Sequence, residues 1–197
     1  MQASGILGRC KGVAWGAGLA YMSFMTLRPI LIHPDPRLKK ICTPVAAVSE
    51  EMRALADDML ETMYDAPGIG LAAPQLGINK RLIVMDCVKE DDATPEPVVM
   101  FNPAVTWVSD ETNVYEEGCL SIPEMYGEVT RPAEVRVSWL DIDGQAQEEQ
   151  FDGLWATCVQ HEIDHLEGKL FIDYLGAMKR QMITRKMQKL KREMARP

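Results

Sequence analysis

The sequence contains only three histidines, and two of them, His161 and His165, stand four residues apart. No run of residues is long and apolar enough to span a membrane, so we expect no membrane partner. The five cysteines show no regular spacing, which argues against a disulfide framework. A reducing, cytoplasmic location is the simpler expectation.

Positive charge is scarce except at the C-terminal end. The chain carries −8 in total, whereas residues 179–197 alone carry +7, which leaves −15 on residues 1–178. An acidic body argues against general nucleic-acid binding, so no DNA partner is expected. The basic tail is a separate candidate for binding phosphates.

The length of 197 residues fits one domain, and neither internal repeats nor a linker between domains are evident. Residues 1–24 differ from the rest because they contain no acidic residue and include a Gly/Ala-rich run. We interpret them as an N-terminal extension upstream of a start at Met22 or Met25. A weak secretory signal is the alternative. Residues 25–197 are expected to form a single catalytic domain.

The motif His-Glu-x-x-His runs from His161 to His165. Residues four apart lie on one face of a helix, so the two imidazoles can hold one metal ion. Glu162 stands one step round the helix, where it can reach a water on that metal as a general base. The flanking residues are mostly apolar, which favours a buried helix over an exposed helix that carries two histidines by chance. Gly168 is expected to end this helix.

A catalytic site of this kind usually has a third protein ligand and one position left open for water. The long protease signature places a third histidine at position 171, but Phe171 is there. Another protease class uses a downstream glutamate, and none occurs between Glu167 and Glu193. The third ligand is therefore expected to be a cysteine, or an aspartate such as Asp173. Spacing alone does not choose among the cysteines.

Alternating apolar patterns predict several short strands between residues 81 and 151, with a hairpin turn at residues 143–144. Helical spacing predicts one helix at about residues 49–64 and another at the C-terminus. Residues 29–32 read as a short strand, and residues 102–103 as a break between two strands. The expected fold class is α+β, with antiparallel, hairpin-rich sheets wrapped around a buried metal-binding helix and a basic C-terminal helix.

Three segments together resemble the three motifs of bacterial peptide deformylase. They are residues 68–75 (GIGLAAPQ), 117–121 (EGCLS) and 160–166 (QHEIDHL), in that family's order and at similar separations. The resemblance covers about residues 25–197. It implies an enzyme that removes the formyl group from the N-terminal formyl-methionine of new proteins and releases formate.

The resemblance also implies the composition of the site. Cys119 would be the third ligand beside the two histidines of the helix. Gln75 and the backbone N–H of Leu120 would hold the developing oxyanion. The implied cofactor is one divalent metal ion, natively Fe²⁺, with Zn²⁺, Ni²⁺ or Co²⁺ accepted. Met125 and Tyr126 stand where some members carry an arginine, so a contact to the downstream part of the substrate is not carried over.

A pocket for the methionine side chain is expected beside His161. Leu154, Thr157 and Cys158 precede it by seven, four and three residues, so they stack on one side of the helix. The alternative is that these residues only pack the core. Gly70 and Gly118 complete the predicted substrate-binding set.

The basic tail has apolar residues at helical spacing, so one face is expected to pack on the body while the other presents positive charge. With the resemblance, this predicts docking to the ribosome, whereas the alternative is an ordinary solvated helix. Two further functions stay open for the whole chain, namely a general metalloprotease and a non-catalytic, ribosome-associated metal-binding module. The predicted packing residues are Met178, Met182, Ile183, Met187, Leu190 and Met194, and the cationic residues are Lys179, Arg180, Arg185, Lys186, Lys189, Lys191, Arg192 and Arg196.

Overall fold

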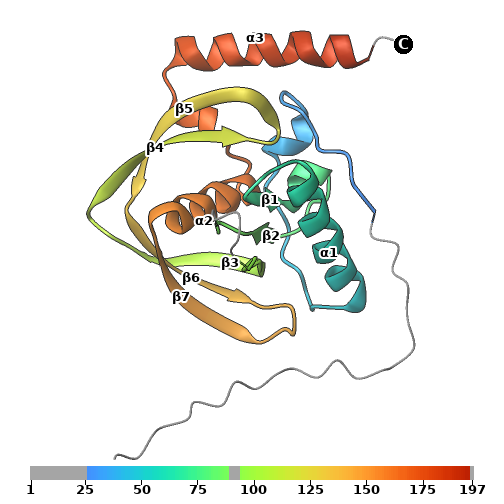
Figure 1. The fold of residues 1–197 in the computed structure, drawn as a ribbon, viewed down its shortest axis with the longest axis vertical. Coiled ribbons are helices and arrows are strands. Elements are labelled where there is room, and N and C mark those ends of the chain that lie inside the picture. The colour runs from blue at the N-terminus through green and yellow to red at the C-terminus, as the bar shows by residue number, and fades with distance from the viewer. Residues whose placement is uncertain (1–25, 89–93, 196–197) are drawn as a thin grey trace, which may run out of the picture.

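The computed structural model describes residues 26–88 and 94–195, so the predicted extension at residues 1–24 lies outside the described part (Figure 1). The helices are α1 (Glu50–Asp65), α2 (Gly153–Leu166) and α3 (Ala177–Met194), with short 3-10 turns η1 (Pro36–Lys39), η2 (Ala73–Leu76) and η3 (Phe171–Tyr174). The strands are β1 (Gly70–Ala72), β2 (Leu82–Met85), β3 (Val98–Val108), β4 (Thr112–Cys119), β5 (Ile122–Pro132), β6 (Glu134–Leu140) and β7 (Ala146–Asp152).

Two antiparallel sheets surround α2. The larger sheet has the strand order β1-β2-β3-β6-β7, and the smaller sheet pairs β4 with β5. Figure 1 shows α2 between the two sheets, α1 beside β1 and β2, and α3 outside the β4–β5 pair. The predicted α+β class, with antiparallel sheets wrapped around a central helix and a further helix at the C-terminus, is confirmed.

Helix α2 owes its position to the apolar side chains that the sequence places around it. Ala156, Val159 and Leu166 are buried in a cluster that also contains residues of β2, β3, β6 and β7. The helix ends where Gly168 takes a left-handed φ of 70°, as predicted. A Cβ atom at this glycine would also stand 2.6 Å from the Lys39 carbonyl oxygen, so a larger residue cannot replace it without a shift of the backbone.

Helix α1 packs on β1 and β2 from the side away from α2. Ser49 caps its N-terminus by accepting a hydrogen bond from the Met52 N–H, and Glu50 and Glu51 occupy the first turn. Its buried face packs into a second core cluster with the neighbouring strands. The residues of that face are Leu55, Ala56, Met59 and Met63.

Helix α3 packs less fully than the sequence suggests. Ile183 and Met187 are buried in a third cluster with residues of β5 and η3, and Leu190 packs partly against them. Met178, Met182 and Met194 are exposed, so their expected packing is wrong. The helix touches the body along one stripe, in which Thr184 and Lys191 add polar contacts to His33 and Asp35.

Two further predictions about the strands are wrong: the strand at residues 29–32 and the break at residues 102–103. Residues 29–32 join no sheet, although the Leu31 N–H donates to the Gln75 carbonyl. The sequence predicted a break between two strands at residues 102–103, but β3 continues through Asn102. The irregularity there is a register shift in the pairing with β6, and Asn102 takes a φ of 53°. Asn102 is held there by two side-chain hydrogen bonds to the backbone of Val45. No helix in the described ranges is long and apolar enough to cross a membrane.

Candidate metal centre and active site

Three side chains converge where the end of β4 meets α2. The ligand atoms of Cys119, His161 and His165 all lie within 4.8 Å of one another. The Cys119 Sγ is 3.3 Å from the His165 Nε2, and the two imidazole ring centres are 5.0 Å apart. One thiol and two imidazoles at this spacing form a donor set that suits a divalent transition metal.

The alternative ligand Asp173 lies elsewhere. Its carboxylate accepts a hydrogen bond from the Leu170 N–H and forms an ion pair with Lys39. It therefore serves the turn η3 and is not among the side chains brought together at the site. The third histidine, His33, is likewise separate, with its Nε2 3.0 Å from the Thr184 hydroxyl of α3.

A buried network of charged side chains supports the histidine pair. The His161 Nδ1 is 2.8 Å from the Glu117 Oε2, so the hydrogen bond fixes which ring nitrogen faces the other candidate ligands. Glu117 also accepts two hydrogen bonds from Arg131, which in turn donates to Asp164. Burial raises the pKa of Glu117, but the hydrogen bonds from His161 and Arg131 outweigh it and leave that pKa below its usual value.

Sequence reasoning did not find this network. Glu117 and Asp164 lie inside two of the three sequence motifs. The function of each, however, depends on its contact with Arg131 of β5, which lies outside the motifs. A single sequence carries no signal that pairs an arginine with carboxylates 14 residues before it and 33 residues after it.

The buried carboxylate of Glu162 points into the same region. The residue is 4% exposed, and its Oε2 has no hydrogen-bond partner among the described residues. Burial raises the pKa of Glu162 to about 7. A carboxylate with a pKa near neutrality can both accept and release a proton, which general acid–base catalysis requires.

Gln75 reaches the site from η2, where it is fully buried. Its Oε1 accepts a hydrogen bond from the Ala72 N–H, which orients the amide. Its Nε2 then lies 3.6 Å from the Cys119 Sγ and 3.2 Å from the Ser121 hydroxyl. The amide thus directs an N–H donor toward the three converging side chains.

A cavity of about 510 Å³ opens over these residues. Its inner part is formed by Cys119, His161, Glu162 and Gln75, whereas His165 is not in its lining. The remaining predicted residues also line it, namely Gly70, Gly118, Leu120, Leu154, Thr157 and Cys158. A cavity of this size, apolar in part and with a few convergent polar groups, is typical of a small-molecule or peptide site.

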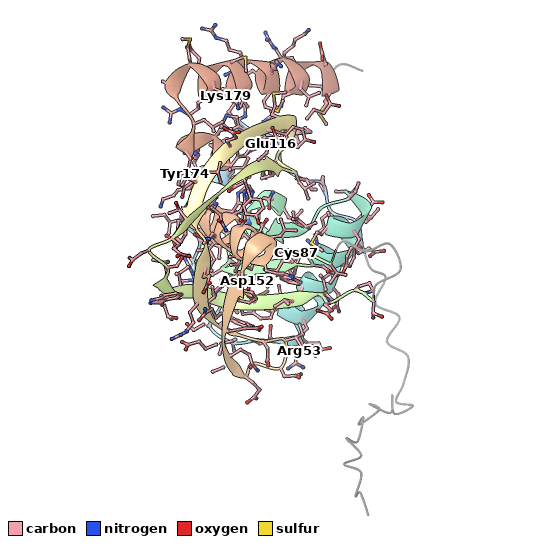
Figure 2. The ribbon with its side chains drawn as sticks, turned by 60° about the vertical axis from the view of Figure 1, so that its left-hand side comes forward. Arg53, Cys87, Glu116, Asp152, Tyr174 and Lys179 are labelled. Atoms are coloured by element: carbon pink, nitrogen blue, oxygen red, sulfur yellow. The ribbon has the colours of Figure 1, made fainter. Side chains whose placement is uncertain are left out.

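The cavity has an outer part that the sequence reading did not assign. Tyr115, Glu116 and Glu124 line it, together with Tyr126, whose ring covers Gly118 so closely that a Cβ there would meet its Cε1 at 2.8 Å. Figure 2 labels Glu116 on the β4 side of the molecule. Glu116, Glu124 and Tyr126 are exposed, and Tyr115 is partly exposed.

Comparison with known proteins agrees with this geometry. The sequence profile described as Polypeptide deformylase matches residues 27–181. The chain belongs to the peptide deformylase family. A peptide deformylase of Methylocella silvestris is 56% identical over 167 residues, which cover 84% of this chain and 85% of that protein. One from Rhodopseudomonas palustris is 57% identical over 166 residues, covering 84% and 95%.

Solved structures of the family share the fold. A peptide deformylase from Legionella pneumophila has a TM-score of 0.80 and 46% identity, covering 87% of this chain and 99% of that one. One from Ehrlichia chaffeensis in complex with actinonin has a TM-score of 0.82 and 37% identity, covering 85% and 99%. The chain is therefore a metal-dependent hydrolase that removes the N-terminal formyl group from new peptides.

Proposed function

We propose that deformylation takes place at the inner end of the cavity, with Cys119, His161 and His165 as metal ligands and Glu162 as general base. The observation that carries this proposal is that Glu162, whose Oε2 has no hydrogen-bond partner among the described residues, lines one cavity together with Cys119 and His161 of the candidate ligand group. The competing reading as a non-catalytic metal-binding module gives no reason for burying that carboxylate without a partner, which is costly.

We propose Fe²⁺ as the native metal, as the resemblance to the family implies, with Zn²⁺, Ni²⁺ or Co²⁺ as possible replacements. The donor set fits such an ion because one thiolate and two imidazoles suit transition metals better than Mg²⁺ or Ca²⁺. The ion would supply Lewis-acid polarisation of the formyl oxygen and acidification of a water molecule. The Cys119 thiolate makes the site sensitive to oxidation, since both a thiolate and ferrous iron oxidise readily.

In this proposal the side chains of the site divide the remaining work. Glu162 takes a proton from the attacking water and delivers it to the leaving amine nitrogen as the C–N bond breaks. Gln75 Nε2 and the Leu120 N–H donate hydrogen bonds to the oxyanion that develops on the formyl oxygen. One such donor is typically worth about 3–4 kcal/mol of the activation barrier.

The methionine side chain is proposed to lie against Leu154, Thr157 and Cys158 of α2. All three line the cavity next to His161, and the unbranched thioether of methionine suits an apolar slot. Gly70 and Gly118 are proposed to border the substrate through their backbones. Neither position has room for a side chain, because a Cβ atom would meet Glu162 at Gly70 and Tyr126 at Gly118.

The test is anaerobic purification followed by joint measurement of metal content and formate release from formyl-methionyl peptides. We expect about one metal ion per chain, predominantly iron. The amount of formate released should equal the amount of free N-terminal amine that appears. Peptide lacking the formyl group is the matched control, and it should stay intact. Cleavage of internal peptide bonds would instead favour a general metalloprotease, and metal binding without turnover would favour the non-catalytic module.

We further propose that the protein works in the cytoplasm and that α3 docks on the ribosome. The support is the exposed row of cations on α3, which includes Lys179, Arg185 and Lys186, on a chain whose first 178 residues carry −15. A negatively charged body would be repelled by ribosomal RNA except through such a helix. Arg196, the last cation of the predicted set, lies outside the described residues.

Residues 25–197 are proposed to form the single catalytic domain, with residues 1–24 as an extension to it. The family profile begins at residue 27, and all three core clusters meet around the site. Expression of residues 25–197 alone should give the metal content and formate release of the full chain, and a loss of either would assign a catalytic role to the first 24 residues.

A further inference from the structure

A continuous chain of hydrogen bonds runs from the protein surface to His161. The Tyr174 hydroxyl donates to the Asp164 Oδ2 at 2.8 Å, and the same oxygen accepts from the Arg131 Nη1 at 2.8 Å. Arg131 donates from its Nε and Nη2 to the two carboxylate oxygens of Glu117, at 2.6 and 3.0 Å. Glu117 completes the chain with its 2.8 Å hydrogen bond to the His161 Nδ1.

Two carboxylates share one guanidinium within this chain. Arg131, Glu117 and Asp164 are all buried, which makes an unsatisfied oxygen costly at either carboxylate. The O–H of Tyr174 gives Asp164 a second donor. Without that donor, Asp164 would depend on Arg131 alone and would draw the guanidinium away from Glu117, which orients His161.

The ring of Tyr174 adds a second contact to the same network. The Arg131 guanidinium carbon lies 4.9 Å from the ring centre, so the ring makes a cation–π contact with a buried cation. Tyr174 itself is 47% exposed and belongs to η3, between α2 and α3 (Figure 2). Burial and the hydrogen bond to Asp164 raise its pKa, in keeping with a hydroxyl that stays a donor.

The neighbours of Tyr174 fix its position. Leu175 packs so tightly on β5 that a Cβ at Gly127 would meet its Cδ1 at 2.8 Å. Asp173 is bound to the Leu170 N–H and to Lys39. Because both adjacent residues are anchored, Tyr174 has little freedom to move away from Asp164.

We propose that Tyr174 is a positioning residue for the metal centre, which holds His161 in its ligand orientation through Asp164, Arg131 and Glu117. The inference rests on the proposed function, since it takes His161 to be a metal ligand. Partners that orient a metal-binding histidine from the outer shell typically change metal affinity by about 10–100-fold when removed, and a partner three side chains further out should have a smaller effect.

The test compares Tyr174→Phe and Tyr174→Ala with Tyr64→Phe as the matched control. Tyr64 is 46% exposed and donates to the Asp86 Oδ2 at 2.7 Å, so it loses the same kind of bond without a connection to His161. The affinity of the demetallated protein for Zn²⁺ is measured by competition with a chelator. The midpoint of thermal unfolding is measured separately, without metal.

We expect Tyr174→Phe to weaken Zn²⁺ binding by about threefold to tenfold and Tyr174→Ala by more, while Tyr64→Phe leaves the affinity unchanged. The thermal midpoints without metal should fall by similar amounts in the two Phe variants, which separates positioning from general stability. Equal Zn²⁺ affinity in Tyr174→Phe and Tyr64→Phe would overturn the inference. A His161→Ala variant included in the series should lose Zn²⁺ binding, and its retention would instead overturn the proposed ligand set.

Discussion

Gly70 of β1 lies directly against Glu162 of α2. A Cβ atom at residue 70 would stand 2.5 Å from the Glu162 Oε1 and 2.8 Å from the Cys158 Sγ. The backbone of β1 therefore forms the wall that confines the carboxylate. This contact ties the first of the three sequence motifs to the third, and it makes the glycine a position where one methyl group disturbs the proposed general base.

Gly70→Ala should reduce kcat by about 100-fold, because the added methyl group displaces a carboxylate that must meet the attacking water. Metal content should remain, since none of the three candidate ligands is among the atoms nearest to a Cβ at this position. Formate release from a formyl-Met peptide is the measurement. Gly176→Ala is the control, because a Cβ there would meet nothing within 4 Å. Equal activity of both variants would contradict the tight fit.

Glu162→Gln should keep the fold and the metal but lose at least about 100-fold in kcat, because the amide cannot accept the proton. The replacement is nearly isosteric, so the buried site is not emptied. Glu162→Ala should lose a similar factor. Metal content and steady-state formate release are measured together, and near wild-type turnover in either variant would remove Glu162 from the proton-transfer role.

Cys119→Ser should lower metal content or change the metal preference, because a hydroxyl is a harder and weaker ligand than a thiolate. Cys158→Ala is the matched control, since Cys158 lines the cavity and donates to the Ile69 carbonyl at 3.4 Å but is outside the ligand group. Elemental analysis after anaerobic purification decides the matter. Loss of metal in Cys158→Ala with retention in Cys119→Ser would reverse the assignment.

Leu154→Trp or Cys158→Trp should raise KM for formyl-Met peptides while metal content stays unchanged, because the indole would fill the slot proposed for methionine. A rise of about tenfold or more is expected, as the loss of one buried side chain of this size is worth about 1.5–3 kcal/mol. Peptides that begin with formyl-Ala need less of the slot and should be affected less. Unchanged KM and kcat for both peptides would leave these residues as core packing.

Neutralising the exposed face of α3 should weaken ribosome binding without loss of formate release from short peptides. Lys179→Gln, Arg185→Gln and Lys186→Gln, combined, spare the buried Ile183 and Met187, which truncation after residue 178 would remove. In a plot of the logarithm of the binding constant against the logarithm of the salt concentration, each lost phosphate contact should make the slope shallower by about one unit. Co-sedimentation at two salt concentrations is the measurement. Sedimentation equal to that of the unmodified chain would make α3 an ordinary solvated helix.

Local spacing is sufficient to predict α2. The four-residue interval between His161 and His165 fixes both imidazoles on one face by helix geometry alone, and Gly168 ends the helix for a similarly local reason. The alternation of apolar residues likewise predicted several strands between residues 81 and 151 and the α+β class, although the strand predicted at residues 29–32 joins no sheet. Strand boundaries failed at Asn102, because a bulge fixed by hydrogen bonds to Val45 keeps β3 continuous.

The remainder of the site depended on contacts between distant segments. From its residues alone, the sequence left any of the five cysteines, or an aspartate such as Asp173, as the third ligand, and it favoured Cys119 only through resemblance to a family. The packing of β4 against α2 brings the Cys119 sulfur to His165, while Asp173 is held by Lys39 and Leu170. In the same way, Arg131 joins Glu117 to Asp164 only because β5 pairs with β4 beside the helix. Helical spacing is set by the covalent chain, whereas these distances are set by strand pairing and core packing, which no local pattern contains.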